Sequence, residues 1–141
     1  MPTSPSPCRP PRWAPWESGN SAAGFSYPLP SLRGETHNAN FLADALLYRA
    51  FKHTGDEKFL APALRATRHS AAKQHADGSW FYGERSSQRW IDNFHTGYNL
   101  DCLKRYIEST GDREYEARLQ RGFEYFTAQF FETYRRGSSC Q

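Results

Sequence analysis

The sequence lacks the features that mark several common classes of protein. Its only cysteines, Cys8, Cys102 and Cys140, are too far apart for a disulfide framework and do not follow the C-x-x-C spacing of a zinc site. No apolar run approaches the ~20 residues of a membrane span, and the N-terminus has no apolar core of a secretory signal. We therefore expect a cytoplasmic protein that uses no metal or cofactor and contacts no membrane.

Charge and motif content argue against further classes of function. The 18 Lys and Arg residues and 15 Asp and Glu residues leave a net charge of +3, spread over mixed positions without a run of one sign. That balance gives no support to nucleic-acid binding. The chain also lacks a P-loop, a dinucleotide fingerprint and a serine nucleophile elbow, so the functions that those motifs identify gain no support.

Proline divides the chain into parts of different composition. Eight of the nine prolines lie in Met1–Pro30, among Ser and Gly and few aliphatic residues. Such a segment cannot bury enough apolar surface to offset the entropy lost on ordering. We therefore predict a disordered Pro/Ser-rich tail over residues 1–35, a folded segment over residues 36–132, and a flexible C-terminal tail over residues 133–141.

The folded segment contains an internal repeat. The tripeptide T-G-D at residues 54–56 recurs at residues 110–112, which is 56 residues later. Each copy follows a stretch with helical periodicity and precedes an acidic residue and an aromatic residue. Gly can end a helix in the left-handed conformation and Asp can cap the next helix, so each copy predicts an αα-hairpin. The predicted fold is all-α, with two αα-hairpin repeats.

Apolar residues at i, i+3 and i+4 mark one face of each predicted helix. In the first repeat these faces are Phe41, Leu42, Ala45, Leu46 and Ala50, then Phe59, Leu60, Ala63, Leu64 and Thr67. In the second they are Phe94, Tyr98, Cys102, Leu103, Tyr106 and Ile107, then Tyr115, Leu119, Phe123, Phe126 and Phe130. The first helix of each hairpin is expected at residues 38–53 and 93–109. Pro62 lacks a backbone N–H, so the helix before it begins either at a cap on Asp56 or near Ala61.

Four motifs in this segment carry a resemblance to a known family. They are H-N-A-N-F-L at residues 37–42, T-G-D-E-K-F at 54–59, Q-x-x-D-G-S-W at 74–80 and W-I-D-N-F-H-T-G-Y-N-L at 90–100. With the 56-residue period they resemble the α/α-toroid superfamily of terpenoid cyclases and prenyltransferase-like proteins, and particularly its polysaccharide-associated members. The resemblance implies a ring of hairpins with alternate helices inside and outside, and a role in carbohydrate metabolism.

The resemblance also implies that the chain is a partial domain. A complete ring has about twelve helices, whereas this chain supplies about four, and two stacked hairpins bury little core. We therefore expect either that further toroid repeats belong to a longer protein or that the chain completes its core by self-association.

The Q-x-x-D-G-S-W motif resembles the QW repeat of the cyclases. Gly78 permits a left-handed turn, Asp77 can close an Asx-turn, and Trp80 offers a large apolar ring. Two interpretations stay open, in which Trp80 either anchors the loop in the core or contacts a ligand. The cyclases also protonate their substrate with an acidic D-x-D-D cluster, which this sequence lacks, so terpenoid cyclisation is disfavoured.

The two inner helices occupy the same place in the repeat, so their N-termini should lie at one end of the ring, called here the mouth. Helix N-termini suit carboxylates and hydroxyl-rich ligands, and aromatic side chains supply the flat apolar faces that a sugar ring needs. The candidate substrate-binding residues are His37, Asn38, Asn40, Trp80, Tyr82, Trp90, Asn93 and Tyr98. The alternative is that the polar residues only cap helices and the aromatic residues only form core.

His95 is the candidate for proton transfer, because imidazole titrates near neutral pH and Asp92 can orient it across the first helical turn. Glu84, on the loop, is the candidate partner acid or base. The alternative is that His95 is a structural, hydrogen-bonded residue.

Two classes of function follow from these observations. The first is a toroid segment that binds a saccharide at the mouth and, if catalytic, takes part in lyase, hydrolase or epimerase chemistry. The second is a non-catalytic helical-repeat module whose aromatic loop is an anchor. The third and weaker hypothesis is that the protein is a relative of the terpenoid cyclases.

Overall fold

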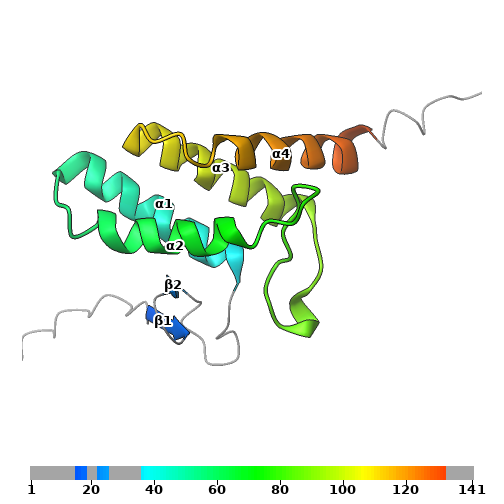
Figure 1. Cartoon of the computed structure of the whole chain (residues 1–141), viewed down its shortest axis with the longest axis horizontal. Helices are drawn as coiled ribbons and strands as arrows, with labels where there is room; N and C mark the ends of the chain where they lie inside the picture. Colours follow the sequence, from blue (N-terminus) through cyan, green and yellow to red (C-terminus); the bar gives the residue numbers. More distant parts are fainter. Residues whose placement is uncertain (1–14, 19–21, 26–35, 133–141) are drawn as a thin grey trace, which may run out of the picture.

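A computed structural model describes residues 15–18, 22–25 and 36–132 (Figure 1). Its order is β1 (Pro15–Ser18), β2 (Ala22–Phe25), α1 (His37–Thr54), α2 (Leu60–Ala72), the 3-10 turn η2 (Ser86–Gln88), α3 (Asn93–Thr110), α4 (Glu116–Thr127) and the π-helical turn η3 (Ala128–Glu132). Helices make up most of the described residues, as the sequence predicts, and α1 and α3 agree with their predicted bounds to within one residue at each end.

The helices form two αα-hairpins that pack side by side. α1 adjoins α2 within the first hairpin, α3 adjoins α4 within the second, and α1 packs directly against α3 (Figure 1). α1 and α3 run in the same direction, whereas α2 and α4 return the opposite way. The starts of α1 and α3 therefore lie at one end of the molecule, next to the loop between α2 and α3, as expected for the mouth. Closure of a toroid by further hairpins stays a prediction.

The two T-G-D turns have the same structure. Gly55 and Gly111 adopt φ of 67° and 74°, and their N–H groups donate to the carbonyls of Phe51 and Ile107. The preceding threonine hydroxyl accepts a hydrogen bond from the aspartate N–H, at 3.2 Å in the first turn and 3.1 Å in the second. The sequence repeat is therefore also a structural repeat.

The start of α2 settles the alternative raised by Pro62. α2 begins at Leu60, close to the predicted Ala61, so Pro62 lies in the first turn, where its missing N–H has no intrahelical partner to lose. Asp56 does not cap the helix, because its carboxylate accepts the N–H of Lys58 in the turn before it, at 3.0 Å.

The core lies between the hairpins and is rich in aromatic rings. Phe41 and Tyr48 from α1 meet Trp80 and Tyr106, with ring centroids 6.0 Å and 5.4 Å apart respectively. The buried apolar side chains are Ala39, Phe41, Ala45, Tyr48, Ala63, Ala66, Ala71, Trp80, Leu100, Cys102, Leu103, Tyr106 and Tyr115. Burial of several whole aromatic side chains is the main stabilising contribution in so small a core.

Part of the predicted apolar face lies outside this core in three of the four helices, α1, α3 and α4. The exposed members are Leu42, Leu46, Phe94, Tyr98 and Phe123. The polar residues Asp44 and Asn99 are buried instead. Helical periodicity identifies an apolar face, but it does not show whether that face packs inside the chain or stays exposed at the surface.

A short β-hairpin forms in the region predicted to be irregular. β1 pairs antiparallel with β2, Pro15 opposite Phe25, and β2 lies along α2 beside α1. The backbone N–H of Phe25 donates to Asn40 Oδ1 at 2.7 Å, so a tertiary contact holds the strand, and local composition gives no sign of it. Pro15 takes the first strand position, where proline is tolerated. The rest of both predicted tails lies outside the described residues.

Candidate functional site

The loop between α2 and α3 joins the starts of α1 and α3 through its backbone. The N–H of His37 donates to the carbonyl of Tyr82 at 3.0 Å, and the N–H of Tyr82 donates to the carbonyl of Trp90 at 2.9 Å. Thr36 and Gly83 form an isolated antiparallel bridge beside them. This loop therefore fixes the geometry of the mouth.

A tight turn anchors the beginning of that loop on α4. Gly78 has a φ of 95°, and Asp77 Oδ1 accepts the N–H of Ser79 at 2.9 Å, which is the predicted Asx-turn. That hydrogen bond, with a second from the Ser79 hydroxyl, outweighs partial burial and holds the pKa of Asp77 below its ordinary value. Gln74 Nε2 donates to the carbonyls of Gly78 and Arg118, so the turn is bonded to the second hairpin.

Trp80 is a structural anchor. Its side chain is 2% exposed and its indole N–H donates to the carbonyl of Ser70 at 2.9 Å. The ring thus contributes buried area between the hairpins, and the alternative role of ligand contact at the surface finds no access in this structure.

Three of the polar residues predicted to bind ligand are also buried, namely His37, Asn38 and Asn40. Asn40 donates to the carbonyl of Ala66 and the hydroxyl of Ser70, both at 2.7 Å, besides accepting from the β-hairpin. Asn40 thus joins α1, α2 and β2, and all three side chains are internal groups of the fold.

Glu84 pairs with His37 and not with His95. Glu84 Oε1 lies 2.8 Å from His37 Nε2, and Oε2 lies 3.7 Å from Lys73 Nζ. Burial alone would raise the pKa of Glu84, but the hydrogen bond and charge of His37, with the cations Lys73 and Arg89, more than offset it and leave the pKa below its ordinary value. Glu84 is therefore a carboxylate that orders the loop.

Asp92 and His95 form the predicted pair at the start of α3. Asp92 Oδ1 accepts the backbone N–H of His95 at 2.7 Å, which caps the helix, and Oδ2 lies 2.8 Å from His95 Nδ1. The side chains are 35% and 27% exposed, so solvent reaches both. A carboxylate at Nδ1 favours the tautomer with a proton there and leaves Nε2 as the basic nitrogen.

Three rings form an aromatic shelf beside this pair, defined as Tyr82, Trp90 and His95. Tyr82 and Trp90 are stacked, with centroids 4.3 Å apart and planes 12° apart, and His95 meets both edge-on, at 4.6 Å and 5.3 Å. Trp90 is still 41% exposed. The shelf therefore combines an accessible apolar surface with an oriented imidazole.

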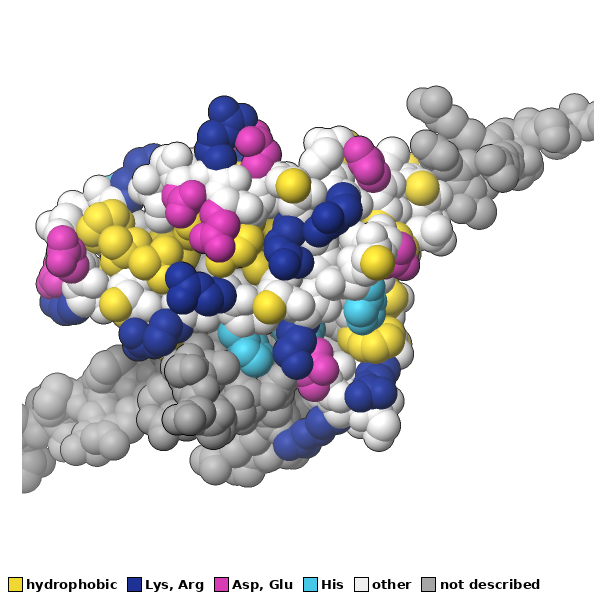
Figure 2. Space-filling view, viewed as in Figure 1, with side chains coloured by type: hydrophobic (Ala, Val, Ile, Leu, Met, Phe, Trp, Pro, Cys, Tyr) yellow, Lys and Arg dark blue, Asp and Glu magenta, His cyan; other side chains and the backbone are white. Residues whose placement is uncertain are grey.

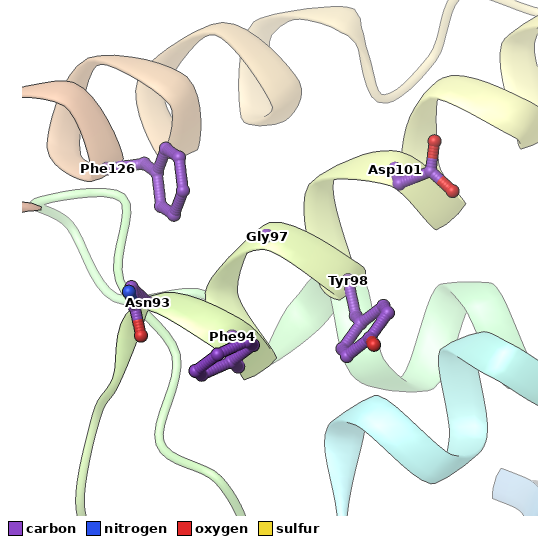
Figure 3. Close-up of a pocket in the computed structure, with 6 residues that line it drawn as sticks. All are labelled: Asn93, Phe94, Gly97, Tyr98, Asp101 and Phe126. Carbon is purple, nitrogen blue, oxygen red and sulfur yellow. The ribbon is translucent and has the colours of Figure 1, made fainter.

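An open groove of about 450 Å³ lies next to the shelf, between α3 and α4 (Figure 3). It is lined by Asn93, Phe94, Gly97, Tyr98, Asp101 and Phe126, and we call it the α3–α4 groove. In Figure 3 the Phe126 ring projects from α4 toward α3, whose Gly97 carries no side chain between them. Phe94 and Tyr98 are 70% and 49% exposed.

The predicted site is therefore divided into three groups by the structure. Tyr82, Trp90, Asp92 and His95 come together at the shelf, while Asn93 and Tyr98 line the groove beside it. The others are internal, or pair internally as Glu84 does. Phe94 and Phe126 were predicted on the apolar faces of their helices and not as site residues, and Gly97 and Asp101 were not candidates. The signal for Phe94, Gly97 and Asp101 is their helical spacing on one side of α3, whereas Phe126 comes from α4.

Other features bear on the candidate chemistry. Charges of both signs are distributed over the helices on the face in Figure 2, with hydrophobic patches between them. Within the described ranges, acidic, histidine and cysteine side chains do not gather in groups of three that would suit a metal ion. The helices described here include none that is long and apolar enough to cross a membrane. No family model, curated protein or solved structure matches the chain.

Proposed function

We propose that the mouth of this protein binds a saccharide at the aromatic shelf. The observation that carries the proposal is the contact of the half-exposed Trp90 with His95, whose imidazole is held by Asp92. Sugar rings have apolar C–H faces and directional hydroxyls, so an exposed indole beside a hydrogen-bonding imidazole and carboxylate complements them. The resemblance to polysaccharide-associated toroid proteins supports the same class of ligand.

His95 is the group suited to proton transfer if the saccharide reacts. With Asp92 at Nδ1, the neutral imidazole offers Nε2 as the base. A C–H next to a carbonyl or carboxyl group of the sugar, or a water molecule at the anomeric carbon, would be its target. Those targets correspond to lyase, epimerase and hydrolase chemistry.

Removal of the Trp90 ring is the test of this proposal. Calorimetric titration of the full chain with neutral and uronate-containing oligosaccharides should find an oligosaccharide that binds. Trp90→Ala should weaken the affinity for that oligosaccharide at least tenfold, which is about 1.4 kcal/mol. Phe123→Ala removes another exposed aromatic ring, on α4, and should leave the affinity unchanged. Equal effects of the two variants, or no binding across the panel, would refute the proposal.

A non-catalytic interaction module is the second candidate function. The α3–α4 groove favours it, because exposed rings on one side of a helix are typical of a docking surface for protein.

A further inference from the structure

The contact between the two hairpins uses a different side of each helix. α3 contributes buried residues that include Cys102, Leu103 and Tyr106, and the Tyr106 ring lies 5.4 Å from that of Tyr48 on α1. α1 contributes Phe41 and Ala45, which belong to the same buried cluster. The interface therefore joins one face of the second repeat to a different face of the first.

The 56-residue offset shows where each face recurs on the other helix. The α1 residues equivalent to Asn99, Cys102 and Leu103 are Ala43, Leu46 and Leu47. These three, with Phe25, line an apolar hollow of about 60 Å³, and Leu46 is 60% exposed. α1 thus repeats the face that α3 uses to contact it, which we call the head face; among the described residues Leu46 is exposed there, while Ala43 and Leu47 are half-buried.

The reciprocal face recurs on α3. The residues of α3 equivalent to Phe41 and Ala45 are Gly97 and Asp101, and both line the α3–α4 groove. They lie on the other side of α3 from Cys102 and Tyr106, by the period of the helix. In place of the Phe41 ring, α3 has Gly97 and therefore an open space, bordered by Phe94 and Phe126 (Figure 3).

We propose that copies of this chain associate head to tail, with the head face of one copy seated in the α3–α4 groove of the next. The occupant is a second copy because these two surfaces, each partly exposed among the described residues, are the repeat equivalents of the two sides of the α1–α3 contact. Apolar Leu46 and Leu47 would meet Phe94 and Phe126, as Leu103 meets the core between the hairpins within the chain.

Such an interface is heterologous, since each copy contributes a different surface. It produces a closed ring or an open chain of copies, and it buries exposed rings that a lone pair of hairpins cannot cover. It is independent of saccharide binding, because the aromatic shelf contributes no residue to either face.

Two charge substitutions, one on each face, test the proposal in the full chain. Leu46→Glu alters the head face, and Gly97→Glu places a charged side chain in the groove. A Cβ at Gly97 would lie 3.7 Å from the Phe126 ring, which is an ordinary contact, so the substitution introduces no backbone or Cβ clash. Leu42→Glu is the control, because Leu42 is exposed on the same helix and its repeat equivalent, Tyr98, is also outside the buried contact.

Sedimentation velocity over a range of concentrations supplies the readout, with circular dichroism as the check on folding. We expect the parent chain and the Leu42→Glu variant to associate. The Leu46→Glu and Gly97→Glu variants should each be monomeric. An equimolar mixture of the two monomeric variants should form a dimer, because each retains one intact surface. A monomeric parent chain overturns the proposal, as does a mixture that stays monomeric. If Gly97→Glu abolishes association and Leu46→Glu leaves it intact, the contact is a symmetric one between two grooves. That result also overturns the proposal.

Discussion

At the scale of single residues, the least expected group is Asp44. Its side chain is fully buried between the helices, and Oδ2 accepts a hydrogen bond from Thr67 at 2.7 Å while Oδ1 has no hydrogen-bond partner among the described residues. Burial raises the pKa of Asp44 well above its ordinary value, and the hydrogen bonds from Thr67 and Ala45 offset only part of that effect. The protonated form is therefore the one that suits the fold.

Asp44→Asn should therefore make stability less dependent on pH. Because the folded pKa exceeds the unfolded one, the native state binds the proton more tightly, and the free energy of unfolding falls as pH rises above about 4. Asparagine carries no such charge, so the variant should be more stable than the parent by about 1 kcal/mol or more at pH 7, with the gap closing toward pH 4. Urea unfolding at a series of pH values measures this.

Asp56→Asn is the matched control for that measurement. Asp56 is exposed, and its hydrogen bonds to Lys58 lower its pKa, so its contribution is present above the unfolded pKa and lost as pH falls. Its replacement should not remove the loss of stability toward high pH. A pH profile for Asp44→Asn parallel to that of the parent chain would show that the buried carboxyl is not responsible.

At the scale of elements, the turn at Gly78 connects the functional loop to α4. Gly78 has a positive φ, and a Cβ there would lie 2.3 Å from the backbone oxygen of Arg121. Gly78→Ala must therefore displace α4 or the loop, and we expect a loss of at least about 2 kcal/mol in thermal or urea unfolding.

Gly55→Ala separates backbone strain from that close contact. Gly55 also has a positive φ, but nothing lies within 4 Å of a Cβ placed there. Its substitution should cost only the left-handed penalty, about 1 kcal/mol. Similar losses at Gly55 and Gly78 would mean that the approach of Arg121 does not constrain the loop.

Local signals in the sequence were sufficient for most of the helices. The T-G-D turns and the spacing of apolar residues gave α1 and α3 nearly to the residue, because caps and periodicity depend on near neighbours. The start of α2 had two candidate positions in the sequence, since Asp56 offered a competing cap. The β-hairpin was missed because its contact with Asn40 comes from elsewhere in the chain.

The candidate site was predicted only where its contacts are local. Asp92 and His95 are three residues apart and pair as expected. His37 lies 47 residues from Glu84 and 33 from Ser70, so its internal pairing could not be inferred from spacing. The exposure of Phe94 was also hidden, since an apolar helix face looks the same whether it packs inside the chain or on a partner.

At the scale of the whole molecule, the duplicated hairpin brings two helix starts to one end. The Tyr82 backbone bonds link them, and the shelf of Tyr82, Trp90 and His95 forms there, with Trp80 buried behind the loop. The central claim is that this end is the ligand-binding surface and that Trp80 only supports it. The two tryptophans therefore serve as an internal comparison in one protein.

Heteronuclear NMR of the full chain during saccharide titration tests that claim most directly. The indole N–H resonance of Trp90 and the imidazole resonances of His95 should shift together along one binding curve, while the indole N–H of Trp80, bonded to Ser70, stays in place. A shift confined to Trp80, or to residues of the α3–α4 groove with Trp90 and His95 unmoved, would contradict the account.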